Sequence, residues 1–385
     1  MSGVIRTPGR QPVVVGLHSL PYSKDIGMTE RHTGALAIQG ALADAGLTAE
    51  DVDGICRYVW QPTTEMEMAR VLGVPNLRWF GAQDYGGGAG PPTVALACAA
   101  IELGLADCIV VWRSRNRSSG GRPWAGQMLA ENQDQFERPF GIVRPVDGIA
   151  LLARIWMQTW GWTREDFGRV ATTVRGHANR NPMAMMHHKT MTMDDYMASR
   201  MIAEPLCLFD NCLETDGALA IVLVAAERAR DMDLSNKPAY VSGYALGSGP
   251  QVYAMTNYYG DDLTRSPNAF VAPELWRNTG LKPGDIDVVQ IYDAFTPQVP
   301  LFFQEFGFCG EGDGTAYVAS DECLTYNTSG GGLSEAYVHG FNLIVEAVRQ
   351  VRGVSSTQVA EVRHCLVTGG NVVPTGAMVL SKEPW

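Results

Sequence analysis

The fold of this chain is indicated by one stretch that occurs twice, as AGLTAEDVD at residues 45–53 and as TGLKPGDID at residues 279–287. Each copy follows a helix-like segment and leads into a short apolar run typical of a strand, residues 54–58 in the first and 288–292 in the second. The second residue of each copy is glycine, which often ends a helix. The repetition therefore predicts an internal duplication.

The order of elements around the two copies repeats as well. Three consecutive glycines, at 86–88 and again at 330–332, precede an apolar helix and then a strand, 108–112 or 365–367. Both halves also open on an apolar strand after a polar stretch. Strands that alternate with helices at these spacings predict two β/α halves, each with its own sheet.

This pattern also predicts where the chain divides. We expect an N-terminal half over residues 1–235 and a C-terminal half over residues 236–385, joined by a polar connector at 231–238. The segment of about 113–206 is rich in Met, Trp, Arg and His and interrupts the first half. We expect it to form a loop domain over the active site.

Composition restricts the function classes. The chain has 385 residues, 46% of them hydrophobic and 18% charged, as in ordinary globular proteins. A net charge of -11 without any basic run argues against nucleic-acid binding. The N-terminus lacks signal-peptide features, and the most apolar stretch, 93–112, is interrupted by Glu102 and Asp107. We therefore expect a cytoplasmic protein without a membrane span.

Neither a metal nor a nicotinamide cofactor is expected. The eight cysteines include no CxxC pair, and no His, Asp or Glu cluster has the spacing of a metal site. The glycines at 86–90 lack the dinucleotide fingerprint and are followed by two prolines. One basic cluster, Arg113, Arg115, Arg117 and Arg122, leaves two interpretations open: a solvated loop, or contacts to a phosphate-bearing ligand such as CoA.

Four motifs carry a resemblance to a known family: DNCLETDGA at 210–218, HANRNP at 177–182, YDAF at 292–295 and NTSGG at 327–331. Over nearly its whole length the chain resembles the thiolase superfamily, and within it the sterol-carrier-protein-type thiolases and lipid-transfer proteins of bacterial steroid degradation. The resemblance implies an α/β thiolase fold, in which duplicated halves form five α-β-α-β-α layers with an inserted loop domain.

The departures from that family are informative. A thiolase needs a nucleophilic Cys, a His that activates it and a second Cys. Here the nucleophile segment reads DYGGGAG at 84–90, Tyr337 stands where the His is expected, and the late Cys is replaced in TGG at 368–370. Tyr292 replaces a further catalytic Asn or His, and His339, two residues out of register, is expected to point elsewhere. Condensation through an acyl-enzyme is therefore excluded.

Two lost catalysts have become tyrosines, which suggests replacement chemistry. The chain resembles the steroid side-chain aldolases of the lipid-transfer-protein group. This resemblance implies that Tyr292 and Tyr337 act as general base and acid in a retro-aldol cleavage of a β-hydroxyacyl-CoA to a ketosteroid and propionyl-CoA. A phenolate base requires a lowered pKa. Tyr244 is a third catalytic candidate, because its loop is expected to border the same pocket.

Substrate contacts are expected from the glycine-rich turns. Backbone N–H groups at Gly87, Gly88 and Gly331 can stabilise the charge of an enolate. Asp293 either polarises a neighbour at this site or caps a turn, and we favour the cap. No Lys occurs in the matched motifs, which argues against a Schiff-base aldolase.

The resemblance also implies partners: a homodimer, and an accessory OB-fold protein with a zinc ribbon. Two other functions stay open. A non-catalytic lipid or acyl-CoA carrier would explain the lost catalytic positions but not the tyrosines. A different thiolase-fold enzyme, such as a decarboxylating condensing enzyme or a residual thiolase, would need a reactive thiol.

Overall fold

The computed structural model describes residues 7, 9–60, 62–84, 86–120, 134–250 and 262–385. Within these ranges, nine strands form one sheet in the order β3-β2-β4-β7-β1-β8-β11-β10-β9. The first-half strands are β1 (Pro12–Ser19), β2 (Gly54–Tyr58), β3 (Trp79–Gln83), β4 (Cys108–Asn116) and β7 (Asp216–Ala225). The second-half strands are β8 (Ala239–Gly247), β9 (Val288–Gln290), β10 (His364–Thr368) and β11 (Thr375–Ser381).

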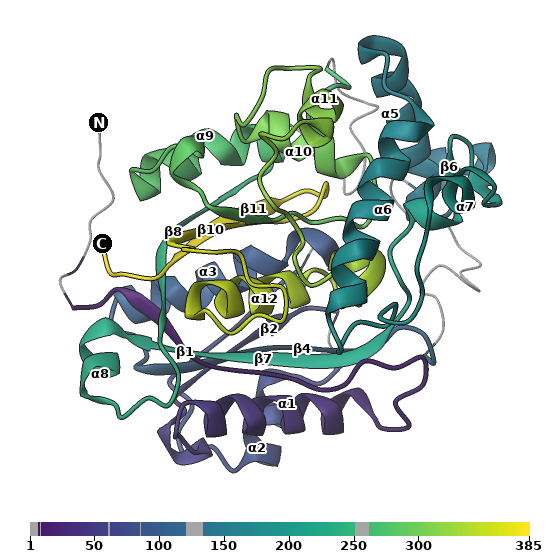
Figure 1. Cartoon of the computed structure of the whole chain (residues 1–385). Helices are drawn as coiled ribbons and strands as arrows, with labels where there is room; N and C mark the ends of the chain where they lie inside the picture. The colour runs from purple at the N-terminus through teal and green to yellow at the C-terminus, as the bar shows by residue number, and fades with distance from the viewer. Residues whose placement is uncertain (1–6, 8, 61, 85, 121–133, 251–261) are drawn as a thin grey trace.

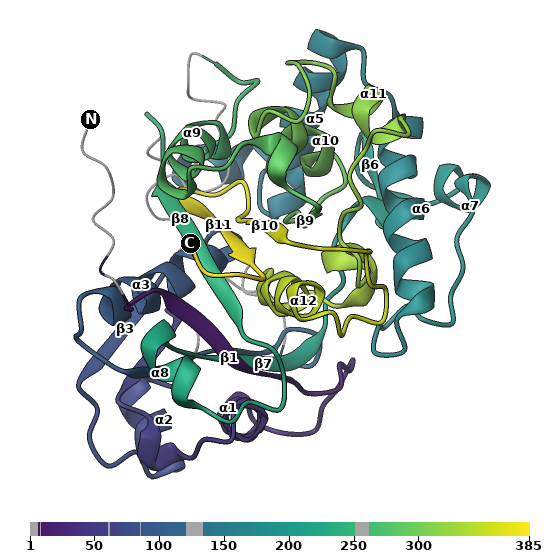
Figure 2. The same ribbon diagram turned by 60° about the vertical axis from the view of Figure 1, so that its left-hand side comes forward.

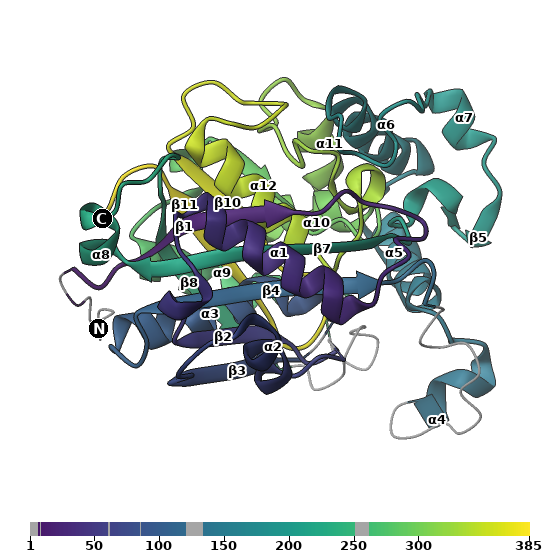
Figure 3. The same cartoon turned by 90° about the horizontal axis from the view of Figure 1, so that it is seen from below.

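Five layers are visible in Figure 1. Helices α1 (Glu30–Asp44) and α2 (Glu65–Leu72) lie on the outer side of the first-half strands, which Figure 3 shows from below. Helices α3 (Gly90–Glu102) and α12 (Phe341–Arg352) lie between the two sets of strands and contact both. The second outer layer is formed by α9 (Asn268–Thr279) and α10 (Gln298–Glu305). The expected layered α/β arrangement is confirmed.

The two sets of strands are joined, contrary to the expectation of two separate sheets. β1 pairs with β8 at only two positions, Val13 with Tyr240 and Val14 with Ala239. Each half keeps its own strand order on either side of this short ladder, because β1 pairs much more extensively with β7 and β8 with β11. The correction therefore concerns the connection between the halves and not the strand pairing within them.

The two copies of the nine-residue stretch have the same backbone conformation. The second residue of each copy is a glycine in the left-handed region, Gly46 at φ 67° or Gly280 at φ 73°, which ends the preceding helix. A short 3₁₀ turn follows, η1 (Ala49–Asp51) or η5 (Pro283–Asp285). In each, the third residue of the turn accepts a hydrogen bond from the backbone N–H that precedes the turn.

The last residue of the stretch holds the neighbouring parallel strand. The Asp53 carboxylate accepts from the backbone N–H groups of Asp107 and Cys108, at 2.9 and 2.8 Å. In the same way Asp287 accepts from Arg363 and His364, at 2.7 and 2.8 Å. The duplication is therefore a repeated local structure, and this explains why the same residue types recur.

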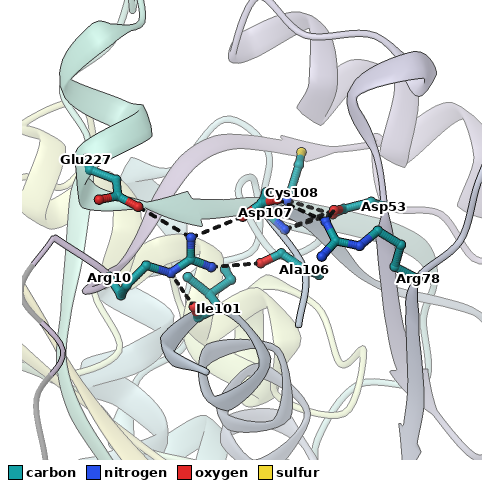
Figure 4. A network of polar contacts seen from close by, with 8 residues as sticks. All are labelled: Arg10, Asp53, Arg78, Ile101, Ala106, Asp107, Cys108 and Glu227. Atoms are coloured by element: carbon teal, nitrogen blue, oxygen red, sulfur yellow. Dashed lines mark hydrogen bonds and ion pairs between the residues drawn. The ribbon is translucent and has the colours of Figure 1, made fainter. Parts of the chain in front are cut away.

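A polar network extends this contact at the start of β4 (Figure 4). Arg78 bridges Asp53 and Asp107, each at 3.0 Å. Arg10 pairs with Asp107 at 3.1 Å and also donates to the carbonyl oxygens of Ile101 and Ala106. The N-terminal segment, α3 and the start of β4 are thereby joined at the edge of the molecule.

The segment for which a loop domain is expected is mostly helical. It contains α4 (Asp134–Glu137), η3 (Arg138–Phe140), α5 (Pro145–Trp160), α6 (Arg164–Arg180), α7 (Met193–Met197), β5 (Met201–Ala203) and β6 (Leu206–Cys207). Figure 2 shows α5, α6 and α7 gathered on one side of the molecule, beside α11 (Gly314–Ala319). The domain boundaries stay a prediction.

Three further short elements complete the described chain: η2 (Gly86–Gly88), η4 (Leu208–Asp210) and α8 (Ala226–Asp231). A π-helical turn, η6 (Gly331–Glu335), follows the NTSGG motif. None of the described helices is long and apolar enough to cross a membrane.

Candidate active site

The hydroxyl groups of Tyr292 and Tyr337 lie 2.5 Å apart, and their rings meet edge to face with centroids separated by 6.1 Å. Tyr292 follows the end of β9, where its backbone N–H donates to Oγ1 of Thr368 at 3.0 Å. Tyr337 follows η6, and its N–H donates to Oγ1 of Thr215 at 3.3 Å. The two tyrosines that the sequence singled out are therefore in direct contact.

Glycines make room for the Tyr292 ring. A Cβ atom on Gly87 would lie 1.8 Å from the Tyr292 hydroxyl oxygen, and Cβ atoms on Gly340 and Gly370 would each lie 2.7 Å from the ring. Gly370 also donates its N–H to the carbonyl oxygen of Gly87 at 3.1 Å. The phenol of Tyr292 thus occupies the space that a side chain at position 87 would need.

Gly88 packs closely for a different reason. A Cβ atom there would lie 2.6 Å from the carbonyl oxygen of Pro374 and from a methyl group of Val372. The turn η2 is therefore held against the segment before β11. The expected contacts of Gly87 and Gly88 with substrate stay a prediction.

Asp293 caps a turn, as we favoured. Its carboxylate is fully buried and accepts from the backbone N–H of Gly332 at 2.7 Å. Gly331 has a φ of 59°, and a Cβ atom there would lie 2.2 Å from Asp293 Oδ2. Burial raises the pKa of Asp293 to about 6. The N–H group of Gly332 already donates to Asp293, so this glycine turn has fewer N–H groups free to bind an enolate than the sequence suggested.

Tyr244 does not join the tyrosine pair. It lies within β8, and its hydroxyl donates to the Glu102 carboxylate at 3.1 Å. Glu102 is the last residue of α3, whereas Gly87 precedes the first residue of that helix. A helix of this length spans roughly 18 Å. The expectation that Tyr244 borders the same pocket is therefore wrong, because its side chain faces the opposite end of α3.

A buried pair that the sequence did not predict stands beside Tyr337. Arg113, within β4, is fully buried, and its Nη2 lies 2.5 Å from Nδ1 of His339. The His339 ring meets the Tyr337 ring edge to face at 5.3 Å. The guanidinium also lies over the Tyr58 ring, 4.8 Å from its centroid. His339 therefore faces the site, contrary to expectation.

The arginine cluster is thus divided among different environments. Arg113 is buried against His339, and Arg115 pairs with Glu30 at 3.2 Å. Arg117 is also buried, and Arg122 lies outside the described residues. Contact of Arg113 or Arg115 with a CoA phosphate is not supported, because each guanidinium already has a partner inside the protein.

Burial and the nearby positive charges act in opposite directions on the pKa of Tyr337. Burial raises the pKa of both Tyr292 and Tyr337. The positive charges of Arg117 and Arg113 oppose this rise at Tyr337. The lowered pKa expected of a phenolate base is therefore not produced, although two cations favour the phenolate form.

The thiols near the site are unreactive. Cys212 interacts electrostatically with both tyrosines, and burial raises the pKa of its thiol to about 12. Cys98 is buried within α3, and burial raises the pKa of its thiol as well. Among the described residues, no group of three or more His, Cys, Asp or Glu is arranged to hold a metal.

The loop-domain helix α6 docks on the turn that leads to Tyr337. Arg175 donates to Oγ of Ser334 at 2.9 Å, and His177 Nδ1 lies 3.2 Å from the carbonyl oxygen of Asn327. His177 is thus structural. These contacts fix η6, and with it the start of the segment that carries Tyr337.

Comparisons with known proteins identify relatives of this chain. A family model described as thiolase C-terminal domain-like matches residues 251–382. The 17-hydroxy-3-oxo-4-pregnene-20-carboxyl-CoA lyase of Mycobacterium tuberculosis is 41% identical, over 96% of this chain and 99% of its own. The steroid side-chain-cleaving aldolase of Thermomonospora curvata is 39% identical, over 96% of this chain and 97% of its own.

Solved structures give the same result. The structure of an Ltp2-ChsH2(DUF35) aldolase matches with a TM-score of 0.92 and 39% identity, and the match covers 98% of this chain and 99% of that one. Human mitochondrial 3-ketoacyl-CoA thiolase matches with a TM-score of 0.69 at 14% identity, covering 98% of this chain and 100% of that one. The second match shows the shared fold alone.

Proposed function

Because the chain belongs to the thiolase superfamily, and within it to the steroid side-chain-cleaving aldolases, we propose that it cleaves a steroid acyl-CoA with a tertiary β-hydroxyl group. The products would be a ketosteroid and propionyl-CoA. The enzyme is an aldolase, a carbon–carbon lyase that acts on an acyl-CoA.

In the proposed reaction the tyrosine pair acts as one unit. In its reactive state the pair has lost one proton. Burial disfavours this state, and the positive charges of Arg117 and Arg113 partly offset that cost while the two phenols share the remaining proton across 2.5 Å. This pair accepts the proton of the β-hydroxyl group as the bond between the α and β carbons breaks. The β carbon becomes the ketone, and the electron pair of the broken bond forms the thioester enolate.

The second step returns the pair to its starting state. A phenol donates its proton to the α carbon of the enolate, which gives propionyl-CoA. The pair again holds one proton, so no oxidant, reductant or covalent intermediate is needed. A general acid and base of this kind contributes roughly 10²- to 10⁴-fold to a rate.

One observation carries the proposal: a phenol fills the space in which a thiolase would need its nucleophile. The side chain that Gly87 lacks is replaced by the Tyr292 hydroxyl, and that hydroxyl is bonded to Tyr337. A protein that only carries lipid would not need two hydroxyl groups this close together in a buried site.

The test is turnover of a steroid acyl-CoA that carries the β-hydroxyl group, with ketosteroid and propionyl-CoA followed by chromatography. We expect both products in equal amounts. Saturable binding of the acyl-CoA without either product would instead indicate a carrier.

We also propose that the enzyme works as a homodimer bound to a DUF35 protein of the OB-fold type. The similar solved structure, which is an Ltp2-ChsH2(DUF35) aldolase, supports the partner, and the homodimer follows from the resemblance to thiolases. Light scattering of the chain with and without such a partner tests the assembly. The turnover assay is therefore run in both states, so that a missing partner is not mistaken for a missing activity.

A further inference from the structure

We propose that His339 donates a hydrogen bond from Nε2 to the thioester oxygen of the substrate, and that Arg113 is a positioning residue that fixes the required tautomer. This inference rests on the proposed retro-aldol function and adds a catalytic residue to it.

The tautomer follows from the chemistry of the two side chains. Arg113 Nη2 lies 2.5 Å from His339 Nδ1. A guanidinium has donors only, so Nδ1 must accept, and the proton of the neutral imidazole is on Nε2. Burial and the nearby charges of Arg113, Arg117 and Arg115 hold the pKa of His339 well below its usual range. The ring is therefore a neutral donor through Nε2.

The ring is also held in one orientation. Its plane stacks on Tyr58 at 6.3 Å and meets Trp60 edge-on at 6.0 Å. The Tyr58 hydroxyl donates to the His339 carbonyl oxygen at 3.1 Å. His339 has a φ of 51°, in the left-handed region that residues other than glycine seldom adopt. Such conformations tend to occur at functional sites.

The donor is unused within the described part of the protein. No residue there accepts a hydrogen bond from Nε2, although the ring is only 5% exposed. The nitrogen is not fully enclosed either. The proposal places the thioester oxygen of the substrate at this nitrogen, beside the Tyr337 ring.

The reaction needs such a donor. As the bond between the α and β carbons breaks, negative charge develops on the thioester oxygen, and donors aimed at that oxygen stabilise the transition state. The Gly332 amide, next to the Gly331 amide that the sequence suggested as a donor, is occupied by Asp293. A neutral imidazole with a guanidinium behind it supplies the missing hydrogen bond.

The first test compares two substitutions of His339 in the complete enzyme. His339→Leu removes the donor, and we expect kcat to fall roughly 10²- to 10³-fold with a much smaller change in KM. His339→Gln keeps an acceptor for Arg113 and an N–H donor, and we expect it to retain at least about tenfold more of kcat than the Leu variant does. Thermal unfolding shows whether each variant is folded.

The second test needs no substitution of His339. In ¹⁵N-histidine-labelled protein, which contains seven histidines, the ring of His339 should show the Nε2–H tautomer. Arg113→Met should produce a mixture of tautomers. It should also move any fall in kcat at low pH to a higher pH than in wild type, because one of the positive charges that lower the pKa of His339 is removed. Around the ring, Arg115 and Arg117 remain as charges, and Tyr58 and Tyr337 remain as titratable groups.

The outcomes separate this inference from the proposed function. If wild type turns over and His339→Leu keeps kcat within about threefold, or if wild type shows the Nδ1–H tautomer, the inference is wrong and the aldolase assignment stands. If wild type shows no turnover with its partner present, the proposed function itself is wrong.

Discussion

The hydroxyl oxygen of Tyr292 lies 1.8 Å from the point at which Gly87 would carry a Cβ atom. The two residues therefore cannot both have a side chain. Tyr292 is also enclosed by Gly340 and Gly370, so its position depends on three glycines from separate parts of the chain. A side chain at position 87 and the phenol of Tyr292 in its present place therefore exclude each other.

Gly87→Ala should abolish the aldolase reaction. The new methyl group would overlap the Tyr292 hydroxyl, so the ring must move and its 2.5 Å contact with Tyr337 is lost. We expect at least roughly a 10²-fold loss of kcat, together with a lower melting temperature.

Gly176→Ala is the matched control. Gly176 lies within α6, and a Cβ atom there would meet nothing within 4 Å. This variant should keep its activity and gain about 0.5–1 kcal/mol of stability. Equal losses in both variants would contradict the steric account.

The tyrosine pair should behave as one unit. We expect Tyr292→Phe and Tyr337→Phe each to lower kcat roughly 10²- to 10⁴-fold. The double variant should be no worse than the more impaired single variant, because the two hydroxyls share one task. Tyr244→Phe should leave kcat unchanged and cost about 1 kcal/mol of stability through its lost bond to Glu102. Additive losses would show that the tyrosines act separately.

Glu335 should make stability depend on pH. It is fully buried, and burial raises its pKa from 4.5 to about 7. Since the folded state holds the proton more tightly, this group stabilises the protein below pH 4.5, and that contribution is lost as the pH rises through 7.

Glu335→Gln keeps acceptors for Ser329 and Asn342 without this titration. In urea unfolding, the variant should therefore gain stability relative to wild type between pH 5 and 8. The exposed Glu322→Gln is the control and should show no such trend. A constant difference between Glu335→Gln and wild type would mean that Glu335 does not titrate in this range.

Cys212 should be dispensable. Its thiol lies near both tyrosines, but burial raises its pKa to about 12, so little thiolate forms near neutral pH. We expect Cys212→Ala to keep kcat within about threefold, because the chemistry needs no nucleophilic sulfur. A loss comparable to that of Tyr337→Phe would favour the thiol-dependent alternative.

The sequence correctly predicted the features that depend on a residue's effect on the backbone near it. Gly46 and Gly280 end helices, and Asp53 and Asp287 hold neighbouring strands through two N–H groups each. Ending a helix and holding a neighbouring strand need particular residues at fixed spacings, so the duplication can be recognised from the amino-acid sequence.

The errors concern side chains whose direction depends on distant packing. Counting along the chain placed His339 two residues out of register and so predicted that it points elsewhere, but the π-helical turn before it and its own left-handed backbone bring it to face the site. Tyr244 faces α3 because β8 packs on that helix. Arg113 carries a full charge in a strand interior, and no periodicity indicates that His339 is its partner.

The most direct test of the central claim is to run the reaction in D₂O and to analyse the released propionyl-CoA by mass spectrometry. Protonation of an enolate by the tyrosine pair predicts one deuterium on the carbon next to the thioester, formed by wild type and lost with turnover in Tyr292→Phe and Tyr337→Phe. Unlabelled propionyl-CoA, or wild-type rates in both variants, would contradict a tyrosine-dependent retro-aldol reaction.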